Sequence, residues 1–258
     1  EGRAAGHTAR GMPVVNLLNL QPGQEVTTLL PVHDFDNATF LLFCTRQGRV
    51  KRVRLEEFSH VRSSGLFAMS LDAGDELAWV RPTSGSDDII LVTAEGQAIR
   101  FAEHDVRPMG RQAGGVIGIR LDDGDFVVAA EVVRPGADLL LVSRAGYGKR
   151  TALDEFRTQG RGGSGVIAMR VTPRTGHVAA ATVAREEDTA VLVSRRGRLI
   201  LIPVRQIPKQ GRSTQGVSLM RLQEGDEIAS IAVGLLSETL STDGVERKTS
   251  HGNGFQQA

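Results

Sequence analysis

Residues 139–171, LLLVSRAGYGKRTALDEFRTQGRGGSGVIAMRV, contain the pattern that decides the fold. An apolar run, 139–142, is followed by a turn at Gly146 and then by a basic segment. A polar loop leads through a glycine-rich stretch, 159–165, into a second apolar run, 166–171. Short apolar runs bounded by glycine and polar residues are typical of β-strands joined by tight turns.

The same pattern recurs about every fifty residues along the chain. The glycine of the first turn returns as Gly48, Gly96, Gly146 and Gly197. The glycine that closes the polar loop returns as Gly11, Gly65, Gly115, Gly165 and Gly216. A third marker, Leu-x-x-Gly followed by an acid or amide, falls at 20–24, 71–75, 121–125 and 222–226. Three markers with one period indicate a repeat protein, whose function depends on what the repeats do together.

Each repeat is predicted to form a four-stranded unit. The first full repeat has four apolar segments, at 40–45, 49–55, 66–71 and 76–80, and offers only single helical turns between them. Four short strands per repeat are typical of a propeller blade, so we predict an all-β fold. The predicted units are a partial blade at 1–37, blades at about 38–87, 88–137, 138–188 and 189–236, and a polar, disordered tail at 237–258.

Composition excludes several classes of protein. Hydrophobic residues make up 40% and charged residues 24% of the chain, which is typical of a globular protein. The single cysteine, Cys44, excludes an intramolecular disulfide and a cysteine-ligated zinc site, and favours a reducing cytoplasm. Neither an apolar run of about 20 residues, as a membrane span needs, nor a signal peptide is present. The chain starts at Glu1, midway through a repeat, so we expect a fragment of a longer protein.

The distribution of charge is more informative than the net charge of +1. Acidic residues gather in the Leu-x-x-Gly turns, which we expect at the end of each repeat opposite the bases. Basic residues gather after the turn glycine and in the glycine loop, and an arc of repeats would join them into one basic edge suited to a polyanion. The predicted DNA-binding residues are Arg49, Lys51, Arg52, Arg54, Arg62, Arg100, Arg107, Arg111, Lys149, Arg150, Arg157, Gln159, Arg161, Arg196, Arg198, Lys209 and Arg212.

The alternative is that these basic residues have no binding role and form the solvated surface of an ordinary β-protein. Their repetition in the same register, beside glycines that let a ligand approach the backbone, favours phosphate binding instead. Aromatic residues are only 4% of the chain and do not alternate with the bases. Stacking platforms for single strands are therefore disfavoured, and duplex DNA is the expected partner.

Patterns that could support catalysis or cofactor binding have simpler explanations. The segment 160–165 matches G-x-G-x-x-G, but a strand-like VIAMRV follows it where a dinucleotide site needs a helix. Tyr147 occupies a position that is Arg49, Gln97 and Arg198 in the other repeats, so we interpret it as a variable surface residue. The six histidines share no metal-ligand spacing. We therefore expect no catalytic residue, no metal and no cofactor in this chain.

Several segments resemble the C-terminal domain of bacterial DNA gyrase A, part of an ATP-dependent type IIA topoisomerase. These are VVNLL at 14–18, GQAIRF at 96–101, DVRPMGR at 105–111, GYGKRT at 146–151 and QGRGGSG at 159–165. The resemblance covers residue 1 to about residue 233. It implies a β-pinwheel, in which each four-stranded blade exchanges a strand with its neighbour and DNA wraps around the outer rim. In that family, wrapping supports negative supercoiling. The catalytic tyrosine lies in the amino-terminal part of gyrase A, and gyrase B hydrolyses ATP.

A departure from the family pattern leaves alternatives open. The signature heptapeptide of the family, Gln-Arg-Arg-Gly-Gly-Lys/Arg-Gly, lies upstream of this chain, and its nearest match at 159–165 has Gly160 and Ser164 in place of basic residues. The equivalent domain of topoisomerase IV is therefore one alternative. A propeller-type protein-interaction scaffold is the other, although Trp-Asp and kelch signatures are lacking and Trp79 is the only tryptophan.

Overall fold

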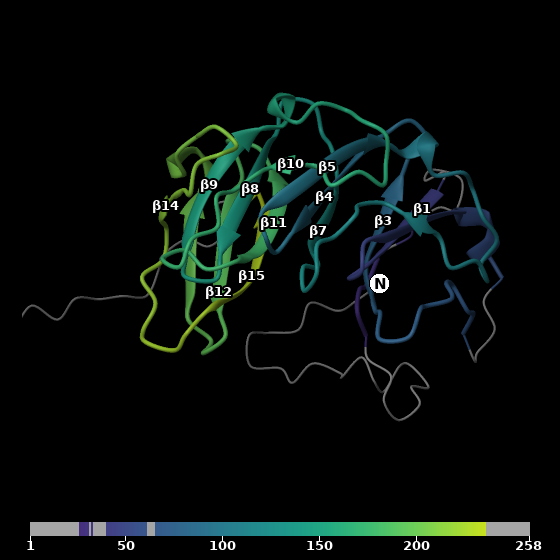
Figure 1. Cartoon of the computed structure of the whole chain (residues 1–258), viewed down its shortest axis with the longest axis horizontal. Coiled ribbons are helices and arrows are strands. Elements are labelled where there is room, and N and C mark those ends of the chain that lie inside the picture. Colours follow the sequence, from purple (N-terminus) through teal and green to yellow (C-terminus); the bar gives the residue numbers. More distant parts are fainter. Residues whose placement is uncertain (1–25, 31, 33–39, 61–64, 236–258) are drawn as a thin grey trace, which may run out of the picture.

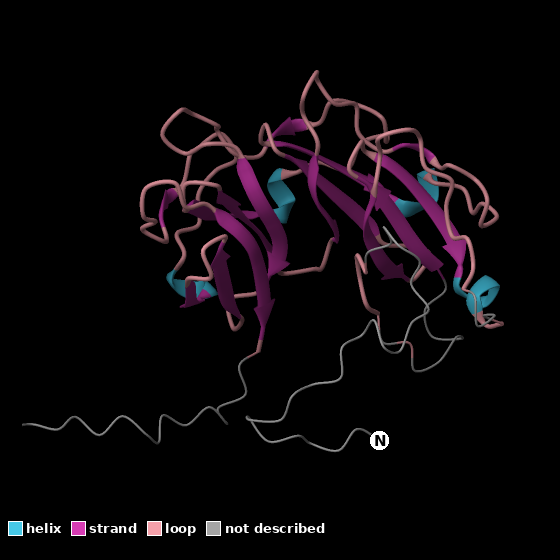
Figure 2. Cartoon of the chain, turned by 90° about the horizontal axis from the view of Figure 1, so that it is seen from below, coloured by secondary structure: helices cyan, strands magenta, loops and turns pink. Residues whose placement is uncertain are grey.

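The computed structural model describes residues 26–30, 32, 40–60 and 65–235. The predicted tail and most of the predicted partial blade lie outside these ranges. Within them the chain is all-β, as predicted, and four antiparallel sheets follow one another along an arc (Figures 1 and 2). The only helices in the described part are single 3-10 turns between strands.

Each sheet is built around one β-hairpin. The first two are β3-β1-β2-β6 and β10-β5-β4-β7, and the third is β11-β8-β9-β14. The fourth has three described strands, β13-β12-β15. The bounds are β1 Phe40–Thr45, β2 Arg49–Arg54, β3 Leu77–Thr83, β4 Asp88–Thr93, β5 Gln97–Ala102, β6 Val116–Ile117, β7 Val127–Val132, β8 Asp138–Ser143, β9 Tyr147–Ala152, β10 Val166–Ile167, β11 Val178–Ala184, β12 Thr189–Ser194, β13 Leu199–Pro203, β14 Val217–Ser218 and β15 Ile228–Gly234.

Neighbouring repeats exchange a short strand. The two-residue strand β6 belongs to the second repeat but pairs with β2 of the first, and β10 and β14 pair in the same way with β5 and β9. Each of the first three sheets is therefore completed by the repeat that follows it, whereas the three described strands of the fourth sheet come from one repeat. The predicted strand at 66–71 is wrong, because these residues form no strand, and its counterparts in the later repeats are only two residues long.

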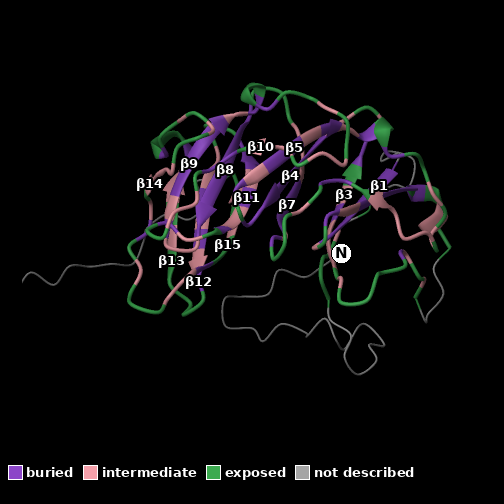
Figure 3. Cartoon of the chain, in the orientation of Figure 1, coloured by how far each residue is buried: buried purple, intermediate pink, exposed green. Residues whose placement is uncertain are grey.

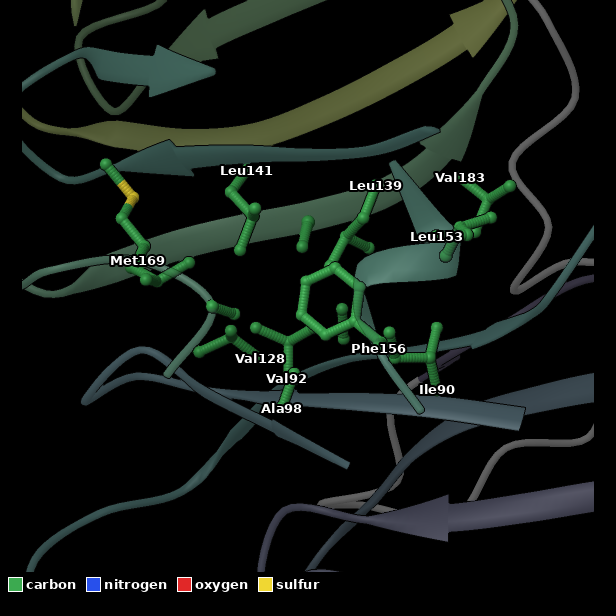
Figure 4. Packing of buried hydrophobic residues seen from close by; sticks show 14 of the residues in the cluster. Ile90, Val92, Ala98, Val128, Leu139, Leu141, Leu153, Phe156, Met169 and Val183 are labelled. Atoms are coloured by element: carbon green, nitrogen blue, oxygen red, sulfur yellow. The ribbon is translucent and has the colours of Figure 1, made fainter. Parts of the chain in front are cut away.

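The apolar cores lie mainly between blades. One cluster joins Val92 of β4 and Ala98 of β5 to Leu139 and Leu141 of β8, with Phe156 beside them (Figure 4). Two further clusters span the first and second blades and the third and fourth. A unit of about fifty residues cannot bury both faces of its own sheet, so each blade depends on its neighbour.

The inner strands of adjacent blades also pack against each other. Strand β7 lies against β11, and β11 lies against β15. Their sequences, VVAAEV, VAAATVA and IASIAVG, are rich in alanine. Small side chains let strands from separate sheets approach closely at the inside of the arc, while the hairpins of the first three blades behind them are mostly buried (Figure 3).

The two recurring glycines stand where the repeats meet. The four turn glycines, together with Gly65, Gly115, Gly165 and Gly216, have φ between 77° and 81°, a conformation that favours glycine. A Cβ at Gly96 would lie 2.2 Å from the carbonyl oxygen of Met169 in the next repeat. At Gly165 it would lie 2.4 Å from the carbonyl oxygen of Ala98 in the preceding repeat. Both markers of the sequence therefore allow close approach of backbone between repeats.

Candidate nucleic-acid interface

The outer edge of the arc is formed by three equivalent loops, 106–115, 156–165 and 207–216, which we call the outer loops. Each follows a 3-10 turn, η3 (Glu103–Asp105), η4 (Leu153–Glu155) or η5 (Val204–Gln206), and crosses the second hairpin strand of the preceding blade. Main-chain hydrogen bonds fix this crossing at the same register. They run from the amides of Met109, Gln159 and Gln210 to the carbonyls of Arg52, Arg100 and Arg150, at 2.8 to 2.9 Å. Each outer loop is thus anchored to the repeat before it.

Basic side chains stand on these loops at repeating positions. Arg107 and Arg157 are exposed at one register, and Arg111, Arg161 and Arg212 share another. Arg161 donates to the carbonyls of Asp105 (2.9 Å) and Ile117 (3.1 Å). Arg212 donates in the same way to the carbonyl of Ile167, at 3.1 Å. Arg161 remains exposed and Arg212 half-buried, so the main chain of the neighbouring repeat orients their guanidinium groups at the surface.

Three further arginines on this edge were not among the predicted contacts. Arg120, Arg170 and Arg221 are exposed, and each follows an exchanged strand by three residues. The main-chain amides of Arg120 and Arg170 donate to Gly163 (2.9 Å) and Thr214 (3.0 Å) of the next outer loop. The signal was present in the sequence, because an arginine closes the second apolar run in three successive repeats.

The two lysines predicted to contact DNA are buried instead. Lys51 and Lys149 are both 0% exposed. The Nζ of Lys149 donates to the carbonyls of Gly211 (2.6 Å) and Arg212 (2.7 Å), and that of Lys51 donates to the carbonyls of Ala68 (2.7 Å) and Arg111. An ammonium group enclosed by backbone carbonyls holds the outer loop and cannot reach a phosphate. We therefore correct their role to positioning the loops.

Arg52, Arg100 and Arg150 also join blades rather than point at solvent. Arg150 is 8% exposed and donates to the carbonyl of Ile207 (2.8 Å) and to the carboxylates of Asp138 (3.1 Å) and Glu186. Arg100 makes the equivalent contacts, to Asp88 (2.8 Å) and to the carbonyls of Leu153 and Phe156 at the two ends of η4. Arg52 pairs with buried Glu103 at 3.3 Å. These arginines fasten each hairpin to the 3-10 turn of the following repeat, so we correct their predicted role as well.

The remaining predicted contacts are scattered. Arg54, Lys209, Arg196 and Arg198 are exposed, whereas Gln159 is half-buried. Arg49 is half-buried and donates to the carbonyl of Gly114 at 3.1 Å, so it braces an outer loop. Arg196 and Arg198 flank a hairpin turn, and Arg198 donates to the carbonyl of Arg221 at 2.9 Å. Arg62 lies outside the described residues.

The acidic turns do not lie at the opposite end from the turn glycines. The carboxylate of Asp125 accepts the amide of Glu95, beside turn glycine Gly96, at 3.0 Å. Asp75 and Asp226 accept the equivalent amides of Gln47 and Arg196, at 3.0 and 3.1 Å. The acid of the third sequence marker therefore ties two turns of one repeat together. This corrects the expected segregation of charge, since the acids and the hairpin turns share one end of the blade.

Burial of Lys149 predicts an unusual dependence of stability on pH. Desolvation is the main cause that lowers the pKa of Lys149, from 10.5 to about 8. The unfolded chain therefore binds more protons than the folded chain between these two values, and stability should rise with pH across that window. We expect the difference in unfolding free energy between the parent and a Lys149→Met variant to increase from about pH 8 to pH 10.5. Urea unfolding at a series of pH values measures it, and a difference that falls over this range would contradict the prediction.

In the part of the chain that the structure describes, no group of three or more His, Cys, Asp or Glu side chains is arranged to hold a metal ion. Among the same residues, no helix is long and apolar enough to cross a membrane. The feature that repeats from blade to blade is the anchored outer loop with its arginines.

Four-stranded repeats that each complete their sheet with a strand from the next repeat define a β-pinwheel. Solved structures place this fold among the C-terminal domains of type IIA topoisomerases. A crystal structure of the C-terminal domain of DNA topoisomerase IV matches with a TM-score of 0.81 and 27% identity, covering 86% of this chain and 70% of that one. The DNA gyrase A C-terminal domain matches with a TM-score of 0.78 and 26% identity, covering 86% and 75%.

The sequence comparisons distinguish the two enzymes. The family model for the DNA gyrase C-terminal domain, beta-propeller, matches residues 39–84, 87–134, 137–185 and 188–234. The DNA gyrase A protein of Halalkalibacterium halodurans is 52% identical over 88% of this chain, and that of Clostridium acetobutylicum is 42% identical over 88%. The chain belongs to the DNA gyrase A C-terminal domain family, and neither alternative is favoured. It spans 27% and 28% of the length of these two relatives.

Proposed function

We propose that this domain binds duplex DNA along its outer loops, without reading base sequence, and bends the duplex around the arc. The observation that carries the proposal is the recurrence of exposed arginines at matching registers, on successive outer loops and just after successive exchanged strands. Arg107 and Arg157 form one such pair, and Arg120, Arg170 and Arg221 form a second row. Evenly repeated positive charge on a curved edge suits a phosphate backbone that follows the same curve.

The anchoring of the loops supports this assignment. The guanidinium groups of Arg161 and Arg212 are held by main-chain carbonyls of the preceding repeat. A guanidinium group has five N–H donors, so those not used in anchoring remain free for phosphate oxygens. Because the positions of these charges are set before DNA arrives, little side-chain entropy is lost on binding.

Within the intact enzyme, this domain would wrap a DNA segment and so support negative supercoiling. Its partners would be the amino-terminal part of the same polypeptide and gyrase B, in the bacterial cytoplasm. DNA cleavage and ATP hydrolysis would belong to those parts, and the domain itself would need no cofactor. The family membership of the chain supports this placement.

Salt dependence tests the phosphate contacts. If about 5–8 phosphates are neutralised, log affinity for a duplex should fall against log salt with a slope of roughly −4 to −7. The triple variant Arg107→Ala/Arg157→Ala/Arg170→Ala should flatten that slope by up to about three units. A matched control, Arg134→Ala/Arg185→Ala/Arg195→Ala, removes three exposed arginines that lie neither on the outer loops nor in the row of Arg120, Arg170 and Arg221. Fluorescence anisotropy over a salt series measures the duplex affinity of the parent, the triple variant and the control.

A salt slope near zero for the parent would contradict binding along the outer loops. An equally flattened slope in the two triple variants would contradict it as well. Strong preference for one base sequence among straight duplexes would contradict recognition through the backbone. Wrapping is tested separately by relaxing a closed circular plasmid with a type I topoisomerase while the chain is bound. Wrapped DNA should keep a shifted linking number after the protein is removed, and an unshifted distribution would mean binding without wrapping.

A further inference from the structure

A short ladder of hydrogen bonds brings two arginines together where the second and third repeats meet. It joins residues 117–120, at and just after β6, to residues 161–163 of the next outer loop. Its bonds run from the Arg161 guanidinium to the carbonyl of Ile117 (3.1 Å), from the amide of Gly162 to the carbonyl of Gly118 (2.7 Å) and from the amide of Arg120 to the carbonyl of Gly163 (2.9 Å). Arg120 and Arg161 therefore extend from the two sides of one ladder, and both are exposed.

The junction of the third and fourth repeats is built in the same way. Arg212 donates to the carbonyl of Ile167 (3.1 Å), and the amide of Arg170 donates to the carbonyl of Thr214 (3.0 Å). We call these four residues, Arg120 with Arg161 and Arg170 with Arg212, the junction arginines. At the first junction the position after the exchanged segment is Ser70, whose amide still donates to the next outer loop, at 3.4 Å. The fold therefore does not require an arginine pair.

The charges of the junction arginines are not balanced by acids. Arginines that fasten the blades pair with carboxylates, as Arg100 does with Asp88 at 2.8 Å. Within the described ranges, none of the junction arginines forms an ion pair. Cations that extend from adjacent chain segments repel each other, and an anion between them removes this repulsion. Each junction thus suits an anionic ligand.

We infer that each pair of junction arginines binds one phosphate of the duplex between its two guanidinium groups, so that every such site is shared by consecutive repeats. This inference rests on the proposed function and specifies how its contacts are grouped. A phosphodiester has two unesterified oxygens, which suit the parallel N–H donors of a planar guanidinium group. The phosphates neutralised in this way lie on the side of the duplex that faces the arc. Repulsion between phosphates is then lower on that side, which favours bending toward the protein.

A shared phosphate predicts the salt slope of a double variant. Each neutralised phosphate contributes about 0.9 to the slope of log affinity against log salt. Arg120→Ala/Arg161→Ala removes two cations but only one phosphate contact, so the slope should flatten by about one unit. Flattening by about two units would mean that the two arginines contact separate phosphates, and would overturn the shared site.

A double-mutant cycle gives a second readout, for which fluorescence anisotropy measures duplex affinity at one salt concentration. The fold-loss in Arg120→Ala/Arg161→Ala should be at least about threefold smaller than the product of the two single losses, because either removal already opens the site. The matched controls are the crossed pairs, Arg120→Ala/Arg212→Ala and Arg161→Ala/Arg170→Ala. They combine the same residues across different junctions, so their losses should multiply to within about twofold.

The first junction allows a gain of affinity to be tested. Arg111 stands at the register of Arg161 and Ser70 at that of Arg120, so Ser70→Arg should complete a third site. We expect duplex affinity to rise at least about threefold, and the rise to disappear in the Arg111→Ala background. Ser70→Ala is the control for the lost bond from the serine hydroxyl to the carbonyl of Gln112 (2.6 Å), and should leave affinity unchanged. An equal rise without Arg111 would overturn the shared site.

The outcomes separate this inference from the proposed function. If the parent binds duplex DNA but losses within a junction multiply as they do in the crossed pairs, the shared sites are overturned while binding along the outer loops stands. Failure of the parent to bind duplex DNA overturns the proposed function itself. Circular dichroism and thermal unfolding verify that each variant is folded. Because a damaged fold cannot raise affinity, Ser70→Arg decides the question even if Arg161→Ala, which removes a loop anchor, fails to fold.

Discussion

Replacement of Gly96 by alanine is expected to destabilise the chain by about 2–5 kcal/mol, because strain at positive φ and a backbone clash add together. Gly96 has φ of 80°, and its new Cβ would lie 2.2 Å from the carbonyl oxygen of Met169. Met169 follows β10, the strand by which the third repeat pairs with β5 of the second blade. Relief of the clash would have to move backbone, which costs far more than rotation of a side chain.

The chain supplies the matched control for this prediction. Gly197 is the equivalent turn glycine, with φ of 79°, but among the described residues only its chain neighbours lie within 4 Å of a Cβ added there. Gly197→Ala should therefore cost only the conformational strain, about 1–2 kcal/mol. Urea unfolding compares the two variants, and hydrogen exchange locates the damage in Gly96→Ala at the junction of the second and third blades. Equal destabilisation would show that the turn conformation alone matters and not the contact between repeats.

Glu103→Leu is the second substitution with a large expected effect. Glu103 is fully buried, and its carboxylate accepts hydrogen bonds from Thr83 (2.7 Å), from the amides of Gly85 (2.6 Å) and Asp87 (2.8 Å), and from Arg52. Removal of the carboxylate leaves buried Arg52 without its ionic partner, and we expect a loss of about 3–5 kcal/mol in unfolding free energy. Urea unfolding at neutral pH measures this loss.

Leucine is chosen because Leu55 and Leu153 occupy this register in other repeats, so the side chain itself suits the site. The double variant Arg52→Leu/Glu103→Leu removes both charges, and Leu201 already stands at the register of Arg52. Replacing a whole buried pair by apolar residues costs much less than breaking it. A double variant as unstable as Glu103→Leu would mean that the hydrogen bonds to Gly85 and Asp87, rather than the unpaired arginine, dominate.

Much of the architecture was predictable because short stretches of neighbouring residues define each repeat. A glycine at each turn and at each loop end, and apolar runs of strand length between them, were enough to predict an all-β protein of four-stranded units. The hairpin strand β1 begins and ends where its apolar run does, at Phe40 and Thr45. Local conformation and strand length depend on neighbouring residues, so they can be read from sequence.

The roles of individual bases were less predictable. Lys149 and Arg161 look alike in the sequence, as two basic residues of one glycine-rich repeat, yet Lys149 is enclosed by carbonyls and Arg161 is exposed. The difference arises because the outer loop of the next repeat, some sixty residues further on, covers Lys149. No local pattern reports which strand a distant loop will cross.

The sequence by itself determined the repeat, the turn glycines, the strand hairpins and the basic character of the outer edge. Only the tertiary structure decided which bases remain outside, because burial depends on strand exchange between repeats. It also decided the place of the acidic turns: Asp125 satisfies the amide of Glu95 across the blade end, a contact between residues thirty positions apart. Charge is a property of the residue, whereas access to a partner is a property of what the rest of the chain leaves uncovered.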